Sequence, residues 1–178
     1  MQRMLLLSGA VGAGKTAVAA MLSEKAGFQR LSTSGYIRQY SSRLGPEGQH
    51  LQLQELGDQL DLKTDYQWVL NDVALPAFIA APEECNWLLD AARKPKQVAH
   101  FRQHLGHVIR HVHLTAPEEV LRERYSGRLT DDDPYDQVAA HPNEVAARSL
   151  EGLADAVFDT SKFETSVVVA HTLNLWKV

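Results

Sequence analysis

Eight residues near the start of the chain have the types and spacing needed to bind phosphate groups. Gly9 to Thr16 read G-A-V-G-A-G-K-T, the G-x-x-x-x-G-K-T pattern called Walker A. Glycines let the backbone turn tightly around an anion, and a helix that follows adds the positive end of its dipole. Lys15 could then reach the outer phosphates of ATP, and the Thr16 hydroxyl could bind Mg²⁺. The pattern predicts a nucleotide-binding loop.

Two elements must flank such a loop to hold it in place. Met4 to Leu7 is an apolar run typical of a buried strand, and Ala17 to Lys25 is rich in helix-forming residues. With both elements present, the phosphate-binding residues are expected to be Gly9, Gly12, Ala13, Gly14, Lys15, Thr16 and Ala17. The alternative is a strand–turn–helix whose glycines serve only the fold.

Short apolar runs and helical patterns alternate along the whole chain. Strands are expected at 4–7, 28–32, 86–89, 108–114 and 156–159. Helices are expected at 16–26, 36–44, 49–60, 66–78, 95–105, 116–128, 143–153 and 165–176. Asp65 and Thr115 are expected to cap the helices that follow them. This order predicts an α/β protein of one domain, residues 1–178, with a three-layer P-loop NTPase fold and a five-stranded parallel sheet flanked by helices.

The composition limits the classes of function. The 178 residues are 44% hydrophobic and 22% charged, with a net charge of -4 and a single cysteine, Cys85. The charge argues against stable nucleic-acid binding, and no apolar run reaches the ~20 residues of a membrane span. Because a core strand leads directly into a working loop, the first residues are not expected to be a signal peptide. We expect a cytoplasmic protein with no membrane partner, and leave open whether it forms a homodimer.

A second candidate site follows the strand at 86–89. Trp87, Leu88 and Leu89 are apolar and bring the carboxylate of Asp90 to the edge of the sheet where the phosphate loop lies. There it could hold Mg²⁺ or orient a substrate hydroxyl. The next residue is alanine, whereas ATPases that hydrolyse ATP usually need an acid there, so the site favours a transferase. The alternative role of Asp90 is to cap a helix.

Arginines gather just before an acidic stretch at 130–135. Arg122, Arg124 and Arg128 could stabilise the charge that spreads over a phosphoryl group during transfer. Residues 122–140 are therefore expected to form a small helical lid over ATP, with Arg124 and Arg128 at the transferred group. The alternative is a solvated basic face that pairs with nearby glutamates.

Five histidines lie close together in the sequence: His100, His104, His107, His111 and His113. No cysteine or Glu-x-x-His pattern accompanies them, and they fall on two different elements. We therefore expect surface or partly buried histidines and no metal site. Trp68, Trp87 and Trp176 are expected in the core.

The order of these parts resembles the nucleoside monophosphate kinase group of P-loop kinases. Leu31 to Arg38, L-S-T-S-G-Y-I-R, is similar to the segment with which adenylate-kinase-like enzymes hold the acceptor nucleotide. The resemblance implies that Thr33 and Arg38 contact the acceptor base and phosphate. It implies an acceptor-binding helical region at about 33–80.

A closer resemblance is to the deoxynucleoside monophosphate kinase and dephospho-CoA-kinase-like branch. It is carried by L-Q-E-L-G-D-Q-L at 53–60 and by L-D-A-A-R-K-P-K-Q-V at 89–98. It resumes at 115–118, 122–128 and 143–155. This resemblance implies that Asp90 and Arg93 lie at the reaction centre. The chain departs from the branch at Gln97, where glutamate is frequent, and in its unusually acidic stretch after the lid arginines.

The resemblance implies transfer of the γ-phosphoryl group of ATP, with Mg²⁺, to a (deoxy)nucleoside monophosphate or similar small acceptor. The catalytic residues are then expected to be Lys15, Asp90, Arg93, Arg124 and Arg128, with Thr16 and Asp90 at the metal. The acceptor-binding residues are expected to be Thr33, Arg38, Arg43, Gln54, Asp58 and Arg93. The alternatives are a dephospho-CoA-type or modified-nucleotide kinase, a nucleotide-binding regulatory ATPase, and an interaction module that keeps the fold without catalysis.

Overall fold

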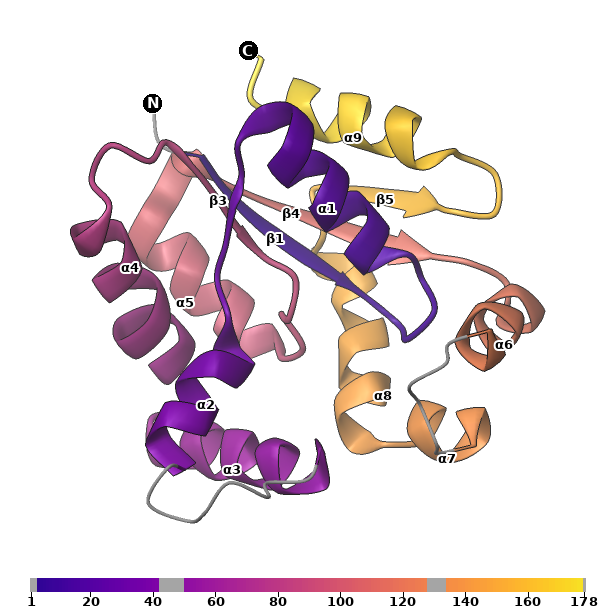
Figure 1. The fold of residues 1–178 in the computed structure, drawn as a ribbon, viewed down its shortest axis with the longest axis horizontal. Helices are drawn as coiled ribbons and strands as arrows, with labels where there is room; N and C mark the ends of the chain where they lie inside the picture. Colours follow the sequence, from indigo (N-terminus) through magenta and orange to yellow (C-terminus); the bar gives the residue numbers. More distant parts are fainter. Residues whose placement is uncertain (1–2, 42–49, 128–133, 178) are drawn as a thin grey trace.

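The centre of the molecule is a parallel β-sheet in which the first strand lies in the middle (Figure 1). The computed structural model describes residues 3–41, 50–127 and 134–177. Its five strands are β1 Arg3–Gly9, β2 Gln29–Arg30, β3 Asn86–Leu89, β4 Ile109–Thr115 and β5 Ala156–Asp159. They pair in the order β2-β3-β1-β4-β5, with every pair parallel. The predicted α/β fold and the number of strands are confirmed.

Helices cover both faces of this sheet, so β1 is buried on both sides (Figure 1). Leu5 and Leu7 pack against the core formed with α1 (Lys15–Ala26) and α9 (Thr165–Asn174). Met4 and Leu6 point the other way, into a second core that contains Val98 and Phe101 of α5 (Pro95–Leu105). Alternate residues of a strand point to opposite faces, and a strand buried on both faces is therefore apolar throughout.

The remaining helices lie beyond the carboxyl ends of the strands or beside the second core. They are α2 (Thr33–Ser41), α3 (His50–Lys63), the π-helix η1 (Val69–Ala74), α4 (Leu75–Ala80), the 3-10 turn η2 (Gly106–Val108), α6 (Glu118–Ser126), α7 (Tyr135–Ala139), α8 (Pro142–Arg148) and the 3-10 turn η3 (Ser149–Leu153). In Figure 1, α2 and α3 form a small helical region below the sheet, and α6 to α8 lie to its right. The candidate site lies between these two groups.

Several predicted boundaries agree with the structure, and the segment expected as a helix at 66–78 is helical from 68 to 80, but its first part is a π-helix. The chain there forms η1 and then α4, because Pro76 has no N–H for a regular helical hydrogen bond. Asp65 does not cap this segment: it has a left-handed backbone with φ of 49° and its carboxylate pairs with Lys96. Trp68 lies in the second core, as expected.

Three further expectations about helix ends are corrected. Thr115 is the last residue of β4 rather than a cap, and α6 begins after Pro117 with no side-chain cap. The helix expected at 143–153 is α8 followed by the tighter turn η3, and Gly152 lies in that turn. The short helix α7 lies within the region 122–140 that was expected to be a helical lid, although no separate helix was predicted at these residues. No helix in the described ranges is both long and apolar enough to span a membrane.

Candidate active site

The phosphate loop joins β1 to α1 and depends on glycines that no other residue could replace without strain. Gly9 and Gly12 have φ angles of 136° and 83°, in the region that favours glycine. A Cβ on Gly9 would lie 2.3 Å from the carbonyl oxygen of Leu114, and one on Gly12 would lie 2.5 Å from that of Leu121. The loop is thus held between β4 and α6 by backbone contact.

The start of α1 has the features of an anion-binding site. Its N-cap residue is Gly14, and no side chain caps the first turn. The first amides of a helix have no partner within the helix, so they are available to a phosphate group. Lys15 Nζ donates to the carbonyl oxygens of Gly9 and Ala10, at 2.6 and 2.8 Å, which holds its ammonium group over the loop. Thr16 and Ala17 are exposed at the same helix end.

A buried hydrogen-bond cluster supports the loop from below, where Ser8 of β1 faces β4. Ser8 Oγ lies 2.7 Å from His111 Nε2 and 2.8 Å from His113 Nδ1. Both histidines are almost fully buried, which corrects the expectation of surface or partly buried side chains. Burial lowers the pKa of His111 to about 4 and also lowers the pKa of His113, so both rings are neutral at pH 7. The serine hydroxyl satisfies a nitrogen on each ring.

A cavity of about 290 Å³ lies between α2, α3, η1 and α5, next to the N-terminus of α8. Four of the predicted acceptor residues line it: Thr33, Arg38, Asp58 and Arg93. It is also lined by residues that were not among the predicted acceptor residues: Asp61, Trp68, Lys94, Gln97 and Asn143. Arg43 and the side chain of Gln54 lie outside the described residues. Four of the six predicted acceptor residues therefore lie around one cavity.

Asp90 and Arg93 border a second hollow that shares Thr33, Ser34 and Arg93 with this cavity. The carboxylate of Asp90 forms an ion pair with Arg30 at the end of β2. It caps no helix, since the N-cap of α5 is Lys94. Asp90 is therefore held by a neighbouring strand at the carboxyl edge of the sheet, where open α/β sheets bind their ligands.

Glu144 connects this region to the phosphate loop. Its Oε2 accepts a hydrogen bond of 2.8 Å from the Val11 amide, and its Oε1 lies 3.4 Å from Arg93 Nη1. The side chain is 8% exposed, so few waters compete for it. These contacts of Glu144 could not be predicted from the sequence, because an acid in the first turn of a helix normally indicates only a favourable dipole contact.

Gln97 and Asp61 form a second connection, across the floor of the cavity. Gln97 Oε1 accepts from the amides of Arg93 and Lys94, at 3.2 and 3.3 Å, and its Nε2 donates to Asp61 Oδ1 at 3.0 Å. A glutamate here could accept from the amides but would repel Asp61. The departure from the related branch at residue 97 therefore has a physical reason in this chain.

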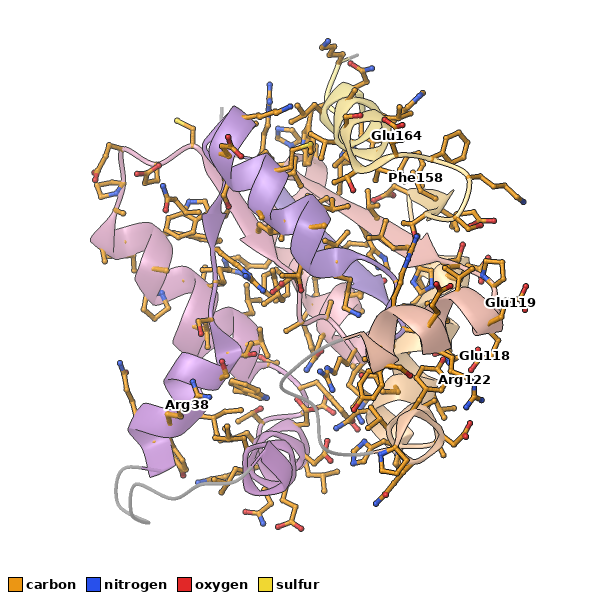
Figure 2. All side chains as sticks on the ribbon, turned by 45° about the vertical axis from the view of Figure 1, so that its right-hand side comes forward. Arg38, Glu118, Glu119, Arg122, Phe158 and Glu164 are labelled. Carbon is orange, nitrogen blue, oxygen red and sulfur yellow. The ribbon has the colours of Figure 1, made fainter. Side chains whose placement is uncertain are left out.

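The arginines of α6 have different partners. Arg122 forms an ion pair with Asp136 of α7, with the closer contact at 2.6 Å, and lies over the Tyr135 ring. Figure 2 shows Arg122 and Glu118 on the outer side of α6, far from Arg38 on α2. Arg122 is thus exposed and paired, but its partner is an aspartate of α7 rather than one of the nearby glutamates of the pairing alternative. Arg128 lies outside the described residues.

Arg124 is connected to the phosphate loop through a single residue, Thr160. It donates to Thr160 Oγ1 and to the Thr160 carbonyl, at 2.7 and 2.9 Å. Thr160 Oγ1 in turn lies 3.2 Å from the carbonyl oxygen of Ala13 in the loop. No sequence pattern indicated Thr160, which follows the last strand in a turn.

The oxygen ligands near the loop suit one particular kind of metal. Mg²⁺ usually binds through one or two protein oxygens together with substrate phosphates and water. The exposed Thr16 hydroxyl and the Asp90 carboxylate are groups of this type. In the parts of the chain that the structure describes, no three histidine, cysteine, aspartate or glutamate side chains are grouped to hold a metal by themselves. The chemistry of these groups therefore fits a metal that arrives with a nucleotide.

Comparison with solved structures finds the same fold in small kinases. A sugar kinase from Janibacter sp. is 16% identical, with a TM-score of 0.63 over 100% of this chain and 96% of its own. A gluconokinase from Sinorhizobium meliloti is 16% identical, with a TM-score of 0.55 over 99% and 92%. Shikimate kinase from Acinetobacter baumannii, in complex with shikimate, is 18% identical, with a TM-score of 0.53 over 98% and 93%.

Comparison with family models identifies the domain itself. None of the curated proteins matches the chain. Residues 4–153, which include the phosphate loop and every cavity residue, match the model of a P-loop family described as an AAA domain (AAA_33). The neighbours are small-molecule kinases by name, and none of the three is a nucleoside monophosphate or dephospho-CoA kinase. The chain belongs to the AAA_33 family of P-loop domains.

Proposed function

We propose that this protein is a kinase that transfers the γ-phosphoryl group of ATP to a small acceptor bound in the cavity beside the phosphate loop. The observation that carries the proposal is the connection through Glu144. One carboxylate contacts both an amide of the phosphate loop and an arginine that lines the cavity. A donor site and an acceptor site that share a rigid contact can hold two reactants in line, which is the main requirement of phosphoryl transfer.

Each group near the loop has a role in this proposal. The loop amides and Lys15 hold the β- and γ-phosphates. Thr16 and Asp90 would hold Mg²⁺, which neutralises phosphate charge when it is bound. Arg93, from the acceptor side, and Arg124, from α6, would stabilise the transferred group. Residues 122–140 would act as the lid, and residues 33–80 would bind the acceptor.

Two classes of acceptor fit the cavity. The first is a nucleoside monophosphate, supported by the resemblance at Thr33 and Arg38, both of which line the cavity. The second is a small hydroxylated acid: Asp58 and Asp61 in the same lining can accept hydrogen bonds from its hydroxyl groups, Arg38 and Arg93 can pair with its carboxylate, and two structural neighbours are named as a gluconokinase and a shikimate kinase. In both cases an oxygen of the acceptor attacks the γ-phosphorus, the bond to the bridging oxygen breaks, and ADP leaves.

The test is a coupled assay of ADP release with the purified chain, Mg-ATP and one acceptor at a time. Nucleoside and deoxynucleoside monophosphates, dephospho-CoA, D-gluconate and shikimate make up the panel. We expect ADP release to rise well above the acceptor-free rate with at least one compound. A steady release that no acceptor changes would instead support a regulatory ATPase, and failure to bind Mg-nucleotide would support an inactive interaction module.

A further inference from the structure

Among the described residues that line the cavity, Asp61 is the one carboxylate that is almost completely buried. It is 5% exposed and lies near the end of α3, one helical turn beyond Asp58. Burial of a carboxylate without compensating contacts is costly, so such a group normally has a full set of donors. The contacts of Asp61 therefore show which of its two oxygens has no hydrogen-bond donor from the described residues.

Among the residues that the structure describes, hydrogen-bond donors reach only one of the two oxygens of Asp61. Oδ1 accepts from Trp68 Nε1 at 2.8 Å and from Gln97 Nε2 at 3.0 Å. For Oδ2, the residues that the structure describes provide no donor, and this oxygen is not among the fully enclosed unpaired atoms. Since Asp61 lines the cavity, Oδ2 is the oxygen that an occupant can reach.

The surrounding charges indicate what kind of occupant this oxygen would accept. Arg93 lies 3.4 Å from Glu144, and Lys94 lies 3.7 Å from Asp58, so each of these cations already has a carboxylate neighbour. The pKa of Asp61 is raised by its burial, and only partly restored by its hydrogen bonds to Trp68 and Gln97. A neutral hydrogen-bond donor satisfies such an oxygen without adding charge to the site.

We propose that Asp61 determines acceptor specificity: its Oδ2 accepts a hydrogen bond from a neutral donor of the acceptor, either a hydroxyl group of a polyhydroxylated acid or an amino group of a nucleobase. This rests on the proposed function, and it adds a residue that selects among acceptors. A site built to accept such a bond rejects analogues that lack the donor, because its buried oxygen is then left unpaired.

The alternative is that Asp61 only holds α3 to η1 and α5 through Trp68 and Gln97. A pair of variants separates the two roles. Asp61→Asn keeps one oxygen for both Trp68 and Gln97, which share Oδ1, and replaces the cavity-facing Oδ2 by an amide donor. Gln97→Glu leaves Asp61 Oδ2 in place and keeps an oxygen for the two backbone amides, but it sets a carboxylate oxygen against Asp61 Oδ1 and so disrupts the contact that holds α3 to α5. Asp65→Asn is the matched control at the exposed end of the same segment.

The experiment measures binding of acceptors to the full chain with Mg-AMPPNP present. The panel has three arms: D-gluconate and shikimate as hydroxylated acids, AMP, GMP and CMP as nucleotides with a base amino group, and UMP and dTMP as nucleotides without one. We expect the wild type to bind at least one compound from the first two arms and to bind the third arm more weakly. The set of compounds that binds shows whether a hydroxyl group or a base amino group donates the hydrogen bond to Asp61.

For that compound, Asp61→Asn should raise Kd by about ten- to a hundredfold, the usual effect of losing a hydrogen bond to a charged group. Asp61→Asn should keep most of its thermal stability, whereas Gln97→Glu should lose thermal stability but bind the compound more tightly than Asp61→Asn does. Asp65→Asn and the affinity for Mg-AMPPNP should stay unchanged. An affinity loss in Gln97→Glu as large as that in Asp61→Asn, or an unchanged Kd in Asp61→Asn, would overturn the proposal. So would a chain that binds Mg-AMPPNP but none of these compounds. A chain that fails to bind Mg-AMPPNP would instead contradict the proposed function.

Discussion

The phosphate loop and the acceptor cavity are neighbours that are built in opposite ways. The loop is made of backbone: Gly9 and Gly12 touch the carbonyl oxygens of Leu114 and Leu121, and the first turn of α1 leaves its amides open. The cavity is made of side chains from five helices, and it is held by carboxylate contacts of Glu144 and Asp61. A backbone site tolerates little change in sequence, whereas a side-chain site can change its ligand while the fold persists.

Each of the three solved structures named above shares the fold with this chain at 16–18% identity, and their names give different acceptors. On the proposed function, the loop binds the same triphosphate whichever acceptor is used, so its sequence can stay constant. The acceptor differs, and the side chains around it can differ too. Changes in the loop should therefore affect every reaction of this chain, and changes in the cavity should affect only some acceptors.

The largest effect is expected from Lys15→Ala. Removing the ammonium group from the phosphates should lower turnover by about 10²–10³-fold or more, because such a donor acts on charge that develops in the transition state. The ADP-release assay measures this, and circular dichroism should show an intact fold. Lys25→Ala, in the last turn of the same helix, is the control and should keep wild-type turnover. Equal activity in the two variants would mean that the loop does not hold the reacting phosphates.

Gly12→Ala tests whether the loop is really set by backbone contact. The new Cβ would meet the Leu121 carbonyl at 2.5 Å in a backbone with φ of 83°. Overpacking and the unfavourable φ together should cost roughly 2–4 kcal/mol of unfolding free energy and abolish tight Mg-nucleotide binding. Urea unfolding and nucleotide titration measure the two effects. Gly152→Ala, where a Cβ meets nothing within 4 Å, should change neither.

The buried histidines below the loop predict a pH effect on this same region. Burial lowers the pKa of His111 from 6.5 to about 4, so the unfolded chain binds a proton more readily than the folded one. This stability is fully present above pH 6.5 and is lost as the pH falls toward 4, by about 2 kcal/mol at pH 5. The lowered pKa of His113 acts in the same direction.

Urea unfolding between pH 7.5 and pH 5 checks this expectation. The exposed variant His104→Gln should show the same loss as the wild type, since its ring is not part of the cluster. A free energy of unfolding that stays flat over this range would show that the cluster is not buried as described.

The smallest effect is expected where the two regions meet. Glu144→Gln keeps an oxygen for the Val11 amide but removes the charge that faces Arg93. We expect kcat/KM for the acceptor to fall about tenfold, with unfolding free energy changed by less than about 1 kcal/mol. Glu119→Gln, on the exposed first turn of α6, is the control. If Glu144→Gln lowered Mg-ATP affinity and left the acceptor kinetics unchanged, the residue would belong to the loop alone.

The difference between the loop and the cavity also explains which parts of the molecule could be predicted from the sequence. The loop, the sheet and strands such as Asn86–Leu89 were predicted closely, because each depends on a local pattern. Glu144, Asp61 and the buried pair His111 and His113 were not, because their roles arise from residues that only the fold brings together. Ser8 and His113 are 105 positions apart, and Val11 and Glu144 are 133 apart. The π-helix before Pro76 was also missed, since a single proline can end, kink or widen a helix.

The central claim, that the loop at 9–16 grips the phosphates of a nucleotide, can be tested most directly by titrating Mg-AMPPNP into the isotope-labelled chain and following its backbone amides by NMR. We predict that the amides of Gly14, Lys15 and Thr16 shift together at saturating nucleotide, while the amide of Gly152 does not move. Saturable shifts elsewhere with these three amides unchanged, or no shift at millimolar nucleotide, would contradict the claim.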